Sequence, residues 1–457
     1  MKPYKGALVM LLILLVAVLP SVTEGQQLDP ILKDLINKGL DKSHGLNSNG
    51  FDVEQAKVDQ QLAKSVFLPK ITLNGSYTHL NDDITFDENT KTLLTETQKL
   101  VIKDAVGLPF NSTFPNTIPL QEVPVLQNQN ILRSSVDLDW VLFSGLEASN
   151  ALQASKHKEA SLNYAGMAEE DKIALKIIET YDKLALVKAS KKVLESSEDY
   201  LDEQVLYVNK AIENGLATPI SRNKIALAKQ QLEGKKLEFE HNNTLLIEAL
   251  HQLTGESRGD LQMLNPQLYS FAVDAEVRGE KRNEIKALEE AEKATQYQAK
   301  MLKSNFIPKV ALKGHYEFLE ENLSLLDPKW YVGVGLKWNV FDGNQSRLKR
   351  RKVQLESAKY REQIAEANEM VSLGISKAEI SYESALMNTK IVQKEVDLAN
   401  ENYEMVNTQY KNNLASINDV LDALNDVEKA NFKLQESYFK ERRAVADLLH
   451  AKGILNY

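Results

Sequence analysis

The stretch Val136-Asp-Leu-Asp-Trp140-Val-Leu-Phe143-Ser-Gly145 returns later in the chain as Val334-Gly-Leu-Lys-Trp338-Asn-Val-Phe341-Asp-Gly343. Five of the ten positions are identical, at an offset of 198 residues. With this offset, residues 136–255 align with residues 334–453 without a gap. Each copy predicts a strand followed by two long helices, so we expect a fold built from two repeats of one unit.

A second repeated segment precedes the first. Phe67-Leu-Pro-Lys-Ile-Thr-Leu-Asn-Gly-Ser-Tyr-Thr-His-Leu80 matches Phe306-Ile-Pro-Lys-Val-Ala-Leu-Lys-Gly-His-Tyr-Glu-Phe-Leu319 at seven of fourteen positions. The offset is now 239 residues, so the first repeat holds 41 more residues between its two strands than the second. They lie in a polar stretch, 81–130, whose four prolines predict a long loop with one short helix near 96–106.

All four strand candidates alternate between an apolar and a polar face over about ten residues, which is typical of membrane β-barrel strands. In the fourth, Val334, Leu336 and Trp338 share one face, and Lys337 points to the other. A half-buried sheet in a soluble protein shows the same alternation and remains the alternative. For a barrel, the aromatic residues expected at the bilayer interface are Trp140, Phe143, Trp330, Trp338 and Phe341.

Two very long helices are predicted after the repeated strands. Residues 145–213 contain no proline and suffice for a helix of roughly 100 Å. Each long helix is expected to end at a turn, Asn214-Gly215-Leu216 or Asn413-Leu414-Ala415, followed by a return helix at about 220–253 or 417–451. In the second repeat a heptad row predicts a left-handed coiled coil. Its members are Ile364, Val371, Ala378, Ala385, Val392, Ala399 and Val406.

The N-terminus has the pattern of a secretory signal peptide, predicted for residues 1–25. Lys2 and Lys5 precede an apolar run of 13 residues, 7–19, which is too short to span a bilayer as a helix. We therefore expect an exported mature chain. The absence of cysteine excludes a disulfide framework, a zinc-thiolate site and a lipid-modified N-terminal cysteine.

The composition and motifs argue against several functions. The net charge is −9 with mixed signs along the chain, whereas a nucleic-acid binder is expected to show a basic stripe. The seven histidines are scattered and show no zinc spacing. No phosphate loop, nucleophile elbow or paired catalytic carboxylate appears. We predict no enzyme activity, no metal and no cofactor.

The predicted organisation has eight segments, and residues 45–50 are expected to form a loop within the second. They are a signal peptide (1–25), an N-terminal helical segment (26–66), a β-hairpin (67–143) with the external loop 81–130, a long helical hairpin (144–255), a connector (256–280), a helix (281–305), a second β-hairpin (306–341), and a second long helical hairpin with the C-terminus (342–457). Four strands cannot close a membrane barrel, because the smallest common barrels have eight. Open sheet edges are not viable in lipid, so the chain is expected to oligomerise.

The repeated strand–helix–turn–helix unit resembles the TolC-like outer membrane efflux protein family. The resemblance rests on the Phe-Leu-Pro strand entry, the Trp-x-x-Phe-x-Gly strand exit, and the turn Asn413-Leu-Ala-Ser-Ile-Asn-Asp-Val-Leu-Asp422. It implies a mainly α fold in which four strands per subunit form one twelve-stranded transmembrane β-barrel of a homotrimer, with a periplasmic α-barrel of coiled-coil helices. It also implies outer membrane lipid, a periplasmic adaptor protein and an inner-membrane pump of resistance–nodulation–division or ABC type as partners, in a Gram-negative bacterium.

Two aspartates after the second turn are the candidate entrance residues. Asp419 and Asp422 stand three apart on one helix face. The resemblance places them at the constricted entrance, where three subunits make two carboxylate rings that favour cations. Like charges placed together should raise one another's pKa. The first repeat has Ser221 and Lys224 at these positions, and the alternative role for the aspartates is to complement the helix dipole.

The resemblance also assigns the turns. It makes Tyr410 a residue that ties the closed entrance, whereas a coiled-coil core position is the alternative. The family's example channel has an arginine where this chain has Ala415, so the latch is differently built here. The residues expected at the adaptor contact are Asn214, Gly215, Leu216, Asn413, Leu414 and Ala415.

The sequence thus predicts the passive outer membrane exit duct of a tripartite efflux or secretion system. One alternative is a periplasmic coiled-coil scaffold with soluble sheets. Another is the exit duct of a type I protein secretion system. Nothing in the chain separates small-molecule from polypeptide cargo.

Overall fold

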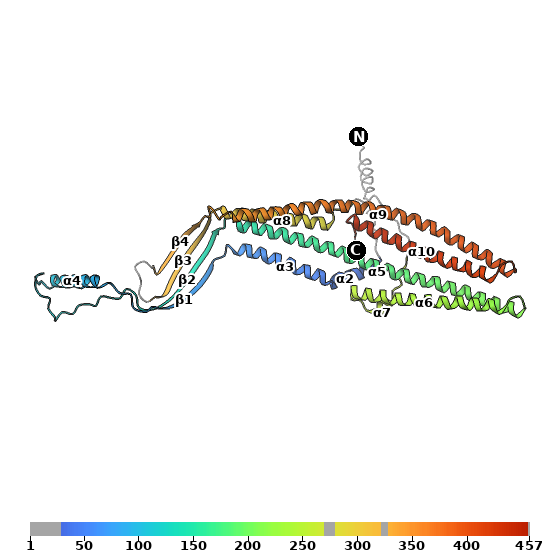
Figure 1. Cartoon of the computed structure of the whole chain (residues 1–457), viewed down its shortest axis with the longest axis horizontal. Helices are drawn as coiled ribbons and strands as arrows, with labels where there is room; N and C mark the ends of the chain where they lie inside the picture. The colour runs from blue at the N-terminus through green and yellow to red at the C-terminus, as the bar shows by residue number, and fades with distance from the viewer. Residues whose placement is uncertain (1–28, 269–278, 321–327, 456–457) are drawn as a thin grey trace, which may run out of the picture. The chain divides into compact units, whose positions relative to one another are not determined.

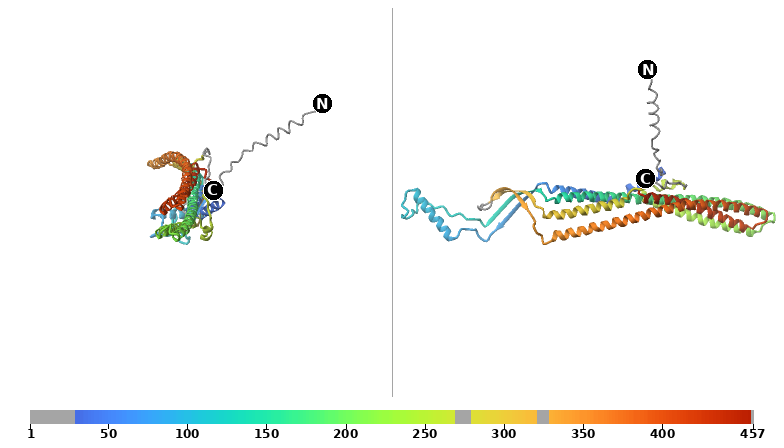
Figure 2. Two further views of the ribbon diagram at one scale, coloured as in Figure 1. Left: turned by 90° about the vertical axis from the view of Figure 1, so that its right-hand side faces the viewer. Right: turned by 90° about the horizontal axis from the view of Figure 1, so that it is seen from above.

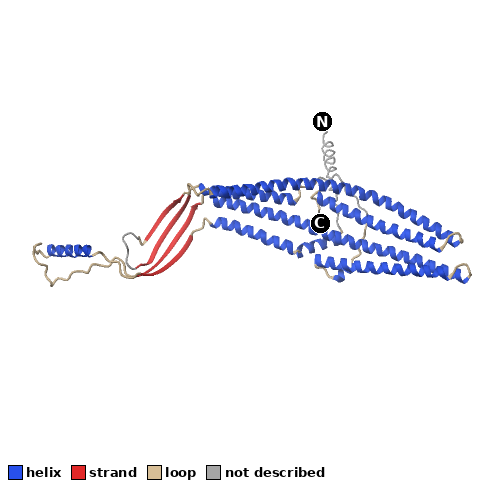
Figure 3. Ribbon diagram, in the orientation of Figure 1, coloured by secondary structure: helices blue, strands red, loops and turns tan. Residues whose placement is uncertain are grey.

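The computed structural model describes residues 29–268, 279–320 and 328–455. Most of these residues are helical, and four strands form one small sheet, which confirms the predicted fold class (Figure 3). The signal peptide predicted for residues 1–25 lies outside the described residues. Among the helices that are described, none combines the length and the apolar character needed to cross a bilayer. Residues 55–159 and 291–359 form one compact unit, and most of the helical hairpins lie in a second.

The sheet is an antiparallel meander in the order β1-β2-β3-β4, as Figure 1 shows. Its strands are β1 (Lys70–His79), β2 (Asn130–Phe143), β3 (Lys309–Glu320) and β4 (Trp330–Lys337). The register places apolar residues of neighbouring strands opposite one another, because Val136 pairs with both Leu73 and Tyr316. One face is therefore apolar, and its side chains are open to solvent in the single chain, as in Leu73 at 69% and Val334 at 68%.

The repeated tryptophan and phenylalanine close each hairpin at its helix end. The indole N–H of Trp140 donates to the carbonyl oxygen of Phe67 over 2.9 Å, and that of Trp338 donates to Phe306 over 3.1 Å. The two bonds join equivalent residues of the two repeats. This explains why a strand entry with phenylalanine and a strand exit with tryptophan recur together.

The strand-to-helix turn has the same backbone conformation in both repeats. Gly145 and Leu146 have φ values of 66° and 70°, and Gly343 and Asn344 have 66° and 67°. Two successive residues in the left-handed conformation reverse the chain, and a bulky residue rarely adopts this conformation. In both turns the first of the two residues is a glycine, which adopts the left-handed conformation without steric cost.

The fourth strand is shorter than the sequence predicted. The second β-hairpin was expected to extend to residue 341, with Trp338 on the apolar face of the strand, but β4 ends at Lys337, and Trp338 and Phe341 follow it. The last ladder pair joins Lys309 to Lys337. The residue before Lys309 is Pro308, which has no backbone N–H to extend the ladder.

Two long helical hairpins make up most of the second unit. They are α5 (Glu147–Glu213) with α6 (Pro219–Thr254), and α9 (Gln345–Lys411) with α10 (Ile417–Ala451). The hairpins lie side by side and their turns lie at the same end in both views (Figures 1 and 2). Residues of the predicted heptad row, such as Ala378 and Val392, are buried where the helices pack together. Thr389, which interrupts the apolar row, is buried with its hydroxyl donating to Ala385 O over 3.1 Å.

Shorter helices complete the fold. They are α2 (Pro30–Lys42), α3 (His44–Ser65), α4 (Glu88–Ala105), α7 (Arg258–Met263) and α8 (Asn283–Lys303), with a 3-10 turn at Ser304–Phe306. In α2, Leu32, Leu35 and Ile36 are almost fully buried in a core with Ile177 and Leu250 of the first hairpin. This core fixes the N-terminal segment on the first repeat.

One local prediction was wrong, and a second placed the start of a helix too late. Residues 45–50 belong to helix α3, because the Ser43 hydroxyl accepts from Leu46 N over 3.2 Å and starts the helix. Asn49 then donates to Leu162 O over 3.1 Å. This contact with α5 favours the helix, although Gly45 and Gly50 have low helix propensity. In the long loop the helix begins at Glu88 instead of 96, because the Asp87 side chain accepts from Thr90 N over 2.6 Å.

A buried ion pair joins the two repeats. Arg442 of α10 donates from Nη2 to Asp182 of α5 over 2.8 Å, and the side chains are only 8% and 3% exposed. Asp182 stands in the first repeat where the second has Ile380. A pair of this kind costs free energy to bury, and removing one partner leaves a buried charge uncompensated.

We therefore expect Arg442→Met to lower the free energy of unfolding by about 3–5 kcal/mol. Chemical unfolding followed by circular dichroism at 222 nm measures the change. Lys191→Met breaks the ion pair with Glu240, whose side chains are 50% and 52% exposed, and is the matched control. The control should cost less than about 1 kcal/mol. An equal effect of the two variants would contradict the assigned role of Arg442.

Candidate functional site

The two helix turns expose equivalent leucines. Gly215 and Asn413 adopt left-handed conformations, with φ of 71° and 63°, as the sequence predicted for tight turns. The chain beyond each turn presents Leu216, 66% exposed, and Leu414, 78% exposed. The predicted turn residues are thus all at the surface except for half-buried Ala415.

Asp419 and Asp422 are both exposed at the start of α10. Asp419 forms a capping box with Ser416: its Oδ2 accepts from Ser416 N over 2.7 Å, and its own N–H donates to Ser416 Oγ over 3.3 Å. Asp422 lies one turn further along and takes no part in this capping box. The two carboxylates therefore have different local roles within one subunit.

The capping box favours the ionised form of the Asp419 carboxylate. The hydrogen bonds from the Ser416 backbone N–H and hydroxyl hold the pKa of Asp419 below its ordinary value of 3.8. The predicted rise by repulsion belongs to rings formed by three subunits and stays a prediction. Within one subunit Asp419 is a helix-capping residue, and its position at the start of α10 also suits the helix dipole.

Asp422 lies on a cavity of about 550 Å³ between the two hairpins. Lys224, the counterpart of Asp422 in the first repeat, lines the same cavity and donates to Asn418 Oδ1 over 2.8 Å. Lys235 of α6 forms an ion pair with buried Glu428 of α10, and both residues line this cavity. The two repeats therefore place cations of α6 opposite carboxylates of α10.

Tyr410 belongs to a ladder of side chains between α5 and α9. Its ring meets that of Tyr207 edge-on at 5.4 Å, and burial raises the pKa of its hydroxyl. One heptad away, Tyr200 and Tyr403 make the same contact at 5.0 Å. Between the two pairs, Gln204 Nε2 donates to Asn407 Oδ1 over 3.0 Å.

Sequence reasoning identified Tyr410 but missed its partner. The signal was present, since Tyr200 and Tyr207 are seven residues apart, as are Tyr403 and Tyr410. The spacing could not reveal which helix faced which, because Tyr207 and Tyr410 differ by 203 residues and are not repeat equivalents. Within the described chain Tyr410 is a packed seam residue next to the turn, and its role in tying the closed entrance stays a prediction.

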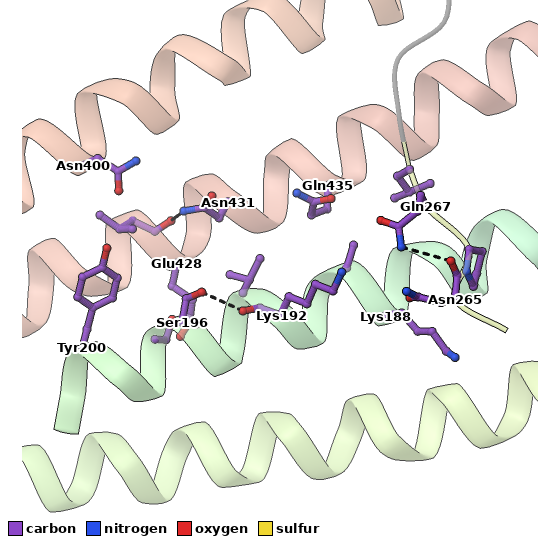
Figure 4. A pocket seen from close by; sticks show the side chains of 16 residues that line it. Lys188, Lys192, Ser196, Tyr200, Asn265, Gln267, Asn400, Glu428, Asn431 and Gln435 are labelled. Carbon is purple, nitrogen blue, oxygen red and sulfur yellow. Dashed lines mark hydrogen bonds between the residues drawn. The ribbon is translucent and has the colours of Figure 1, made fainter. Parts of the chain in front are cut away.

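A second cavity, of about 400 Å³, lies between α5, α9 and α10, and connector residues 265–268 line one side of it (Figure 4). Its wall is polar, with Asn431 and Gln435 from α10 and Asn265 and Gln267 from the connector. Lys188 donates to Gln262 O over 3.1 Å and also to Leu264 O, and burial lowers its pKa. The lysine thus anchors the connector to α5.

In the part of the chain that the structure describes, no three His, Cys, Asp or Glu residues gather as metal ligands. The predicted interface aromatics lie elsewhere, in or beside the strands. Trp140 (39%), Phe143 (41%), Trp330 (64%), Trp338 (59%) and Phe341 (75%) are all exposed.

Comparison with known proteins confirms the family resemblance. The model of the outer membrane efflux protein family matches residues 279–449, which span the second repeat. No curated protein matches the chain in sequence. The fold is similar to that of the outer membrane protein VceC from Vibrio cholerae, with a TM-score of 0.71, 16% identity, and coverage of 93% of this chain and 96% of that one.

Two further solved structures share the fold. The Campylobacter jejuni CmeC outer membrane channel has a TM-score of 0.68 at 15% identity, over 93% of this chain and 86% of its own. CusC, whose crystal structures describe conformational changes accompanying folding and transmembrane channel formation, has a TM-score of 0.70 at 12% identity, over 94% of this chain and 95% of its own. At these identities the likeness establishes the fold, and the family model matches the part of the chain that holds the second repeat.

The capping box makes the second turn sensitive to acid. Because the folded pKa of Asp419 is lowered, its stabilising effect is present above 3.8 and is lost as the pH falls through the lowered value. Ser416→Ala should weaken the helix start by about 1 kcal/mol, or roughly fivefold in hydrogen-exchange protection of residues 417–424 at pH 6. The loss of protection between pH 5 and pH 3, corrected for intrinsic exchange, should also be smaller in the variant.

Thr218→Ala is the matched control, because Thr218 is the N-cap of α6 but makes no side-chain capping bond. Exchange in residues 219–226 should be unchanged by it. Equal exchange in the wild type and Ser416→Ala would show that the capping box does not hold the turn.

Proposed function

We propose that the chain is the outer membrane channel of a tripartite efflux or secretion system, a passive exit duct that an inner-membrane pump and a periplasmic adaptor open. The observation that carries the proposal is the sheet, with one solvent-exposed apolar face, two unpaired edges and four helices joined to one end. In water such a face and such edges are liabilities. In a bilayer the same apolar face is required, provided that the edges are paired.

The unpaired edges support a homotrimer. Three subunits with four strands each supply a twelve-stranded barrel, and even strand numbers from eight upward are usual in the outer membrane. A second feature of the helical unit agrees, since a row of apolar side chains along α9 remains exposed in the single chain. Its members are Leu373 (65%), Ile380 (68%), Met387 (65%), Leu398 (65%) and Met405 (53%). Successive members lie seven residues apart, except for a step of eleven from Met387 to Leu398, and such a row is typical of a coiled-coil seam without its partner.

The exposed aromatics and the predicted signal peptide fit this location. Trp140 and Trp338 bind the strand entries through their N–H groups and leave much of each ring exposed, which suits the boundary between headgroups and acyl chains. The long polar loop between β1 and β2 then lies on the outer surface, where long loops are usual. The helical hairpins are the periplasmic part.

The second turn is the proposed entrance. Asp419 and Asp422 are exposed and near the turn, so three subunits would present two carboxylate rings that attract cations. Asp419 stays ionised because the hydrogen bonds from Ser416 hold its pKa below the ordinary value. The exposed leucines at the two turns, Leu216 and Leu414, offer the adaptor equivalent apolar contacts.

The tyrosine ladder is the proposed latch. It holds α9 on α5 next to the turn, where the chain has Ala415 in place of an arginine link. Its polar centre is incompletely satisfied, since buried Gln204 Oε1 has no hydrogen-bond partner in the described structure. An unsatisfied acceptor costs about 1–3 kcal/mol, which lowers the free energy needed to separate the two helices.

The entrance assignment predicts the conductance behaviour. Asp419→Asn combined with Asp422→Asn should weaken block by multivalent cations, such as hexamminecobalt, at least tenfold in planar bilayers, because both carboxylate rings are lost. Glu401→Gln with Glu404→Gln is the control, since these exposed glutamates of α9 have the same spacing of three. Block that is unchanged in the aspartate variant would remove the entrance assignment.

The assembly predicts a heat-modifiable trimer that needs detergent for extraction. Ile380→Glu with Met387→Glu should abolish it, because two charges per subunit would be buried in the α9 seam. Semi-native electrophoresis with and without boiling measures the change. Leu93→Glu with Val101→Glu places the same charges on the exposed face of α4 and should leave the trimer intact. A wild-type chain that is monomeric in plain buffer would favour the scaffold alternative and refute the channel.

A further inference from the structure

The first two turns of α9 concentrate positive charge. All residues of 347–352 but one are basic, and we call them the basic cluster: Arg347, Lys349, Arg350, Arg351 and Lys352. Arg350 is half-buried and the others are exposed. Within the described parts of the chain, none of them forms an ion pair. The helix dipole makes the start of a helix an unfavourable place for cations, and the first turn holds no acidic residue to offset them. The cluster therefore does not stabilise its own helix.

The first repeat lacks this cluster. At the offset of 198 residues, the equivalent segment is Ser149-Asn-Ala-Leu-Gln-Ala154, which carries no charge. That helix start is packed within the chain, since Ala148 and Ala154 are buried and Asn150 donates to Ser304 Oγ over 3.2 Å. The charges thus occur in the repeat whose helix start is open.

The basic cluster lies directly beyond an aromatic strand exit. Trp338 and Phe341 are 59% and 75% exposed, and α9 begins at Gln345, next to the end of β4 (Figure 1). At about 1.5 Å per residue, residues 347–352 cover about 8 Å of helix. The headgroup region on each side of a bilayer is of similar thickness, roughly 5–8 Å. Aromatics at the edge of the hydrocarbon would therefore place the basic cluster at the depth of the headgroups.

The open side of the helix combines apolar and charged groups. Ser346 and Ser357 are buried and mark the packed side, where Ser346 Oγ accepts from Asn305 over 3.0 Å. Leu348 lies on the open side and is 64% exposed. Arg351 and Lys352 follow it by three and four residues, so they share its side of the helix. Their long apolar stems can lie beside acyl chains while the charged ends reach phosphate groups.

We infer that the basic cluster is a binding surface for the phosphate groups of anionic phospholipids in the periplasmic leaflet of the outer membrane. This inference rests on the proposed function, which places the helix end of the sheet on the periplasmic side. Each Lys or Arg near an anionic membrane surface strengthens binding about fivefold. Arginine also binds phosphate through two parallel hydrogen bonds. Free phosphate would match the charges, but the exposed Leu348 and the adjoining aromatics fit a lipid.

Tryptophan fluorescence can report which lipid lies beside the cluster. The chain has three tryptophans, and Trp140 and Trp338 bond to the strand entries at the helix end of the sheet. Trp330 lies at the other end of β4, so Trp330→Phe serves as the background. The trimer is reconstituted in phosphatidylcholine vesicles that contain acyl-brominated phosphatidylglycerol or acyl-brominated phosphatidylcholine as the quencher.

The background protein should bind phosphatidylglycerol at least fivefold more tightly than phosphatidylcholine at about 50 mM salt. At about 1 M salt the preference should fall below twofold, because the charges are screened. Inorganic phosphate at constant ionic strength should leave the preference unchanged. A preference that inorganic phosphate removes would indicate a free-phosphate site and overturn the lipid assignment.

Lys349→Gln with Arg351→Gln and Lys352→Gln should reduce the preference below twofold. The helix should persist, because removing cations from a helix start relieves an unfavourable interaction. The matched control removes three exposed lysines farther along the second hairpin, and it should keep the preference. Its substitutions are Lys390→Gln, Lys394→Gln and Lys429→Gln.

Two results would overturn the lipid surface and leave the channel standing, provided that the protein still runs as a heat-modifiable trimer. One is a background protein without lipid preference, and the other is an equal preference in the cluster variant and the control. Quenching by neither brominated lipid would show that the sheet does not enter the bilayer, and would overturn the channel as well.

Discussion

The outer edges of β1 and β4 each present a row of backbone N–H and C=O groups that the described chain does not pair. In a hydrocarbon environment each such group costs several kcal/mol, so these edges dominate what the sheet can do. The apolar face agrees with this constraint, since its side chains are open to solvent in the single chain. In the proposed trimer the four strands of one chain are one third of a closed barrel.

Much of the fold could be predicted because the sequence contains it twice. The repeated motif located the four strands, the two long helices and their turns, and the structure adds the cause, since Trp140 and Trp338 each bond to a repeated phenylalanine. Local predictions failed where one contact decided the outcome. Ser43 caps α3 across two glycines, Asp87 starts α4 early, and Pro308 ends the ladder of β4. Single hydrogen bonds of this kind leave no periodic pattern in a sequence.

The candidate site was predictable in position but not in chemistry. The spacing of Asp419 and Asp422 placed both on one helix face, but it could not show that Ser416 engages one of them and lowers its pKa. The tyrosine ladder was hidden for another reason, because its partners are not repeat equivalents. Duplication made the two hairpins alike, and the differences between them, such as Lys224 facing the cavity that Asp422 lines, are where the repeats have taken separate roles.

The indole bond at the base of each hairpin separates the geometry of the strands from the length of what connects them. The first repeat has 41 more residues between its strands than the second, and yet both hairpins close on the same atoms. The entropy of closing a connection rises only with the logarithm of its length, so such insertions disturb the strands little. The segment between β1 and β2 can therefore change in length and sequence while the strands and their closing bonds stay the same.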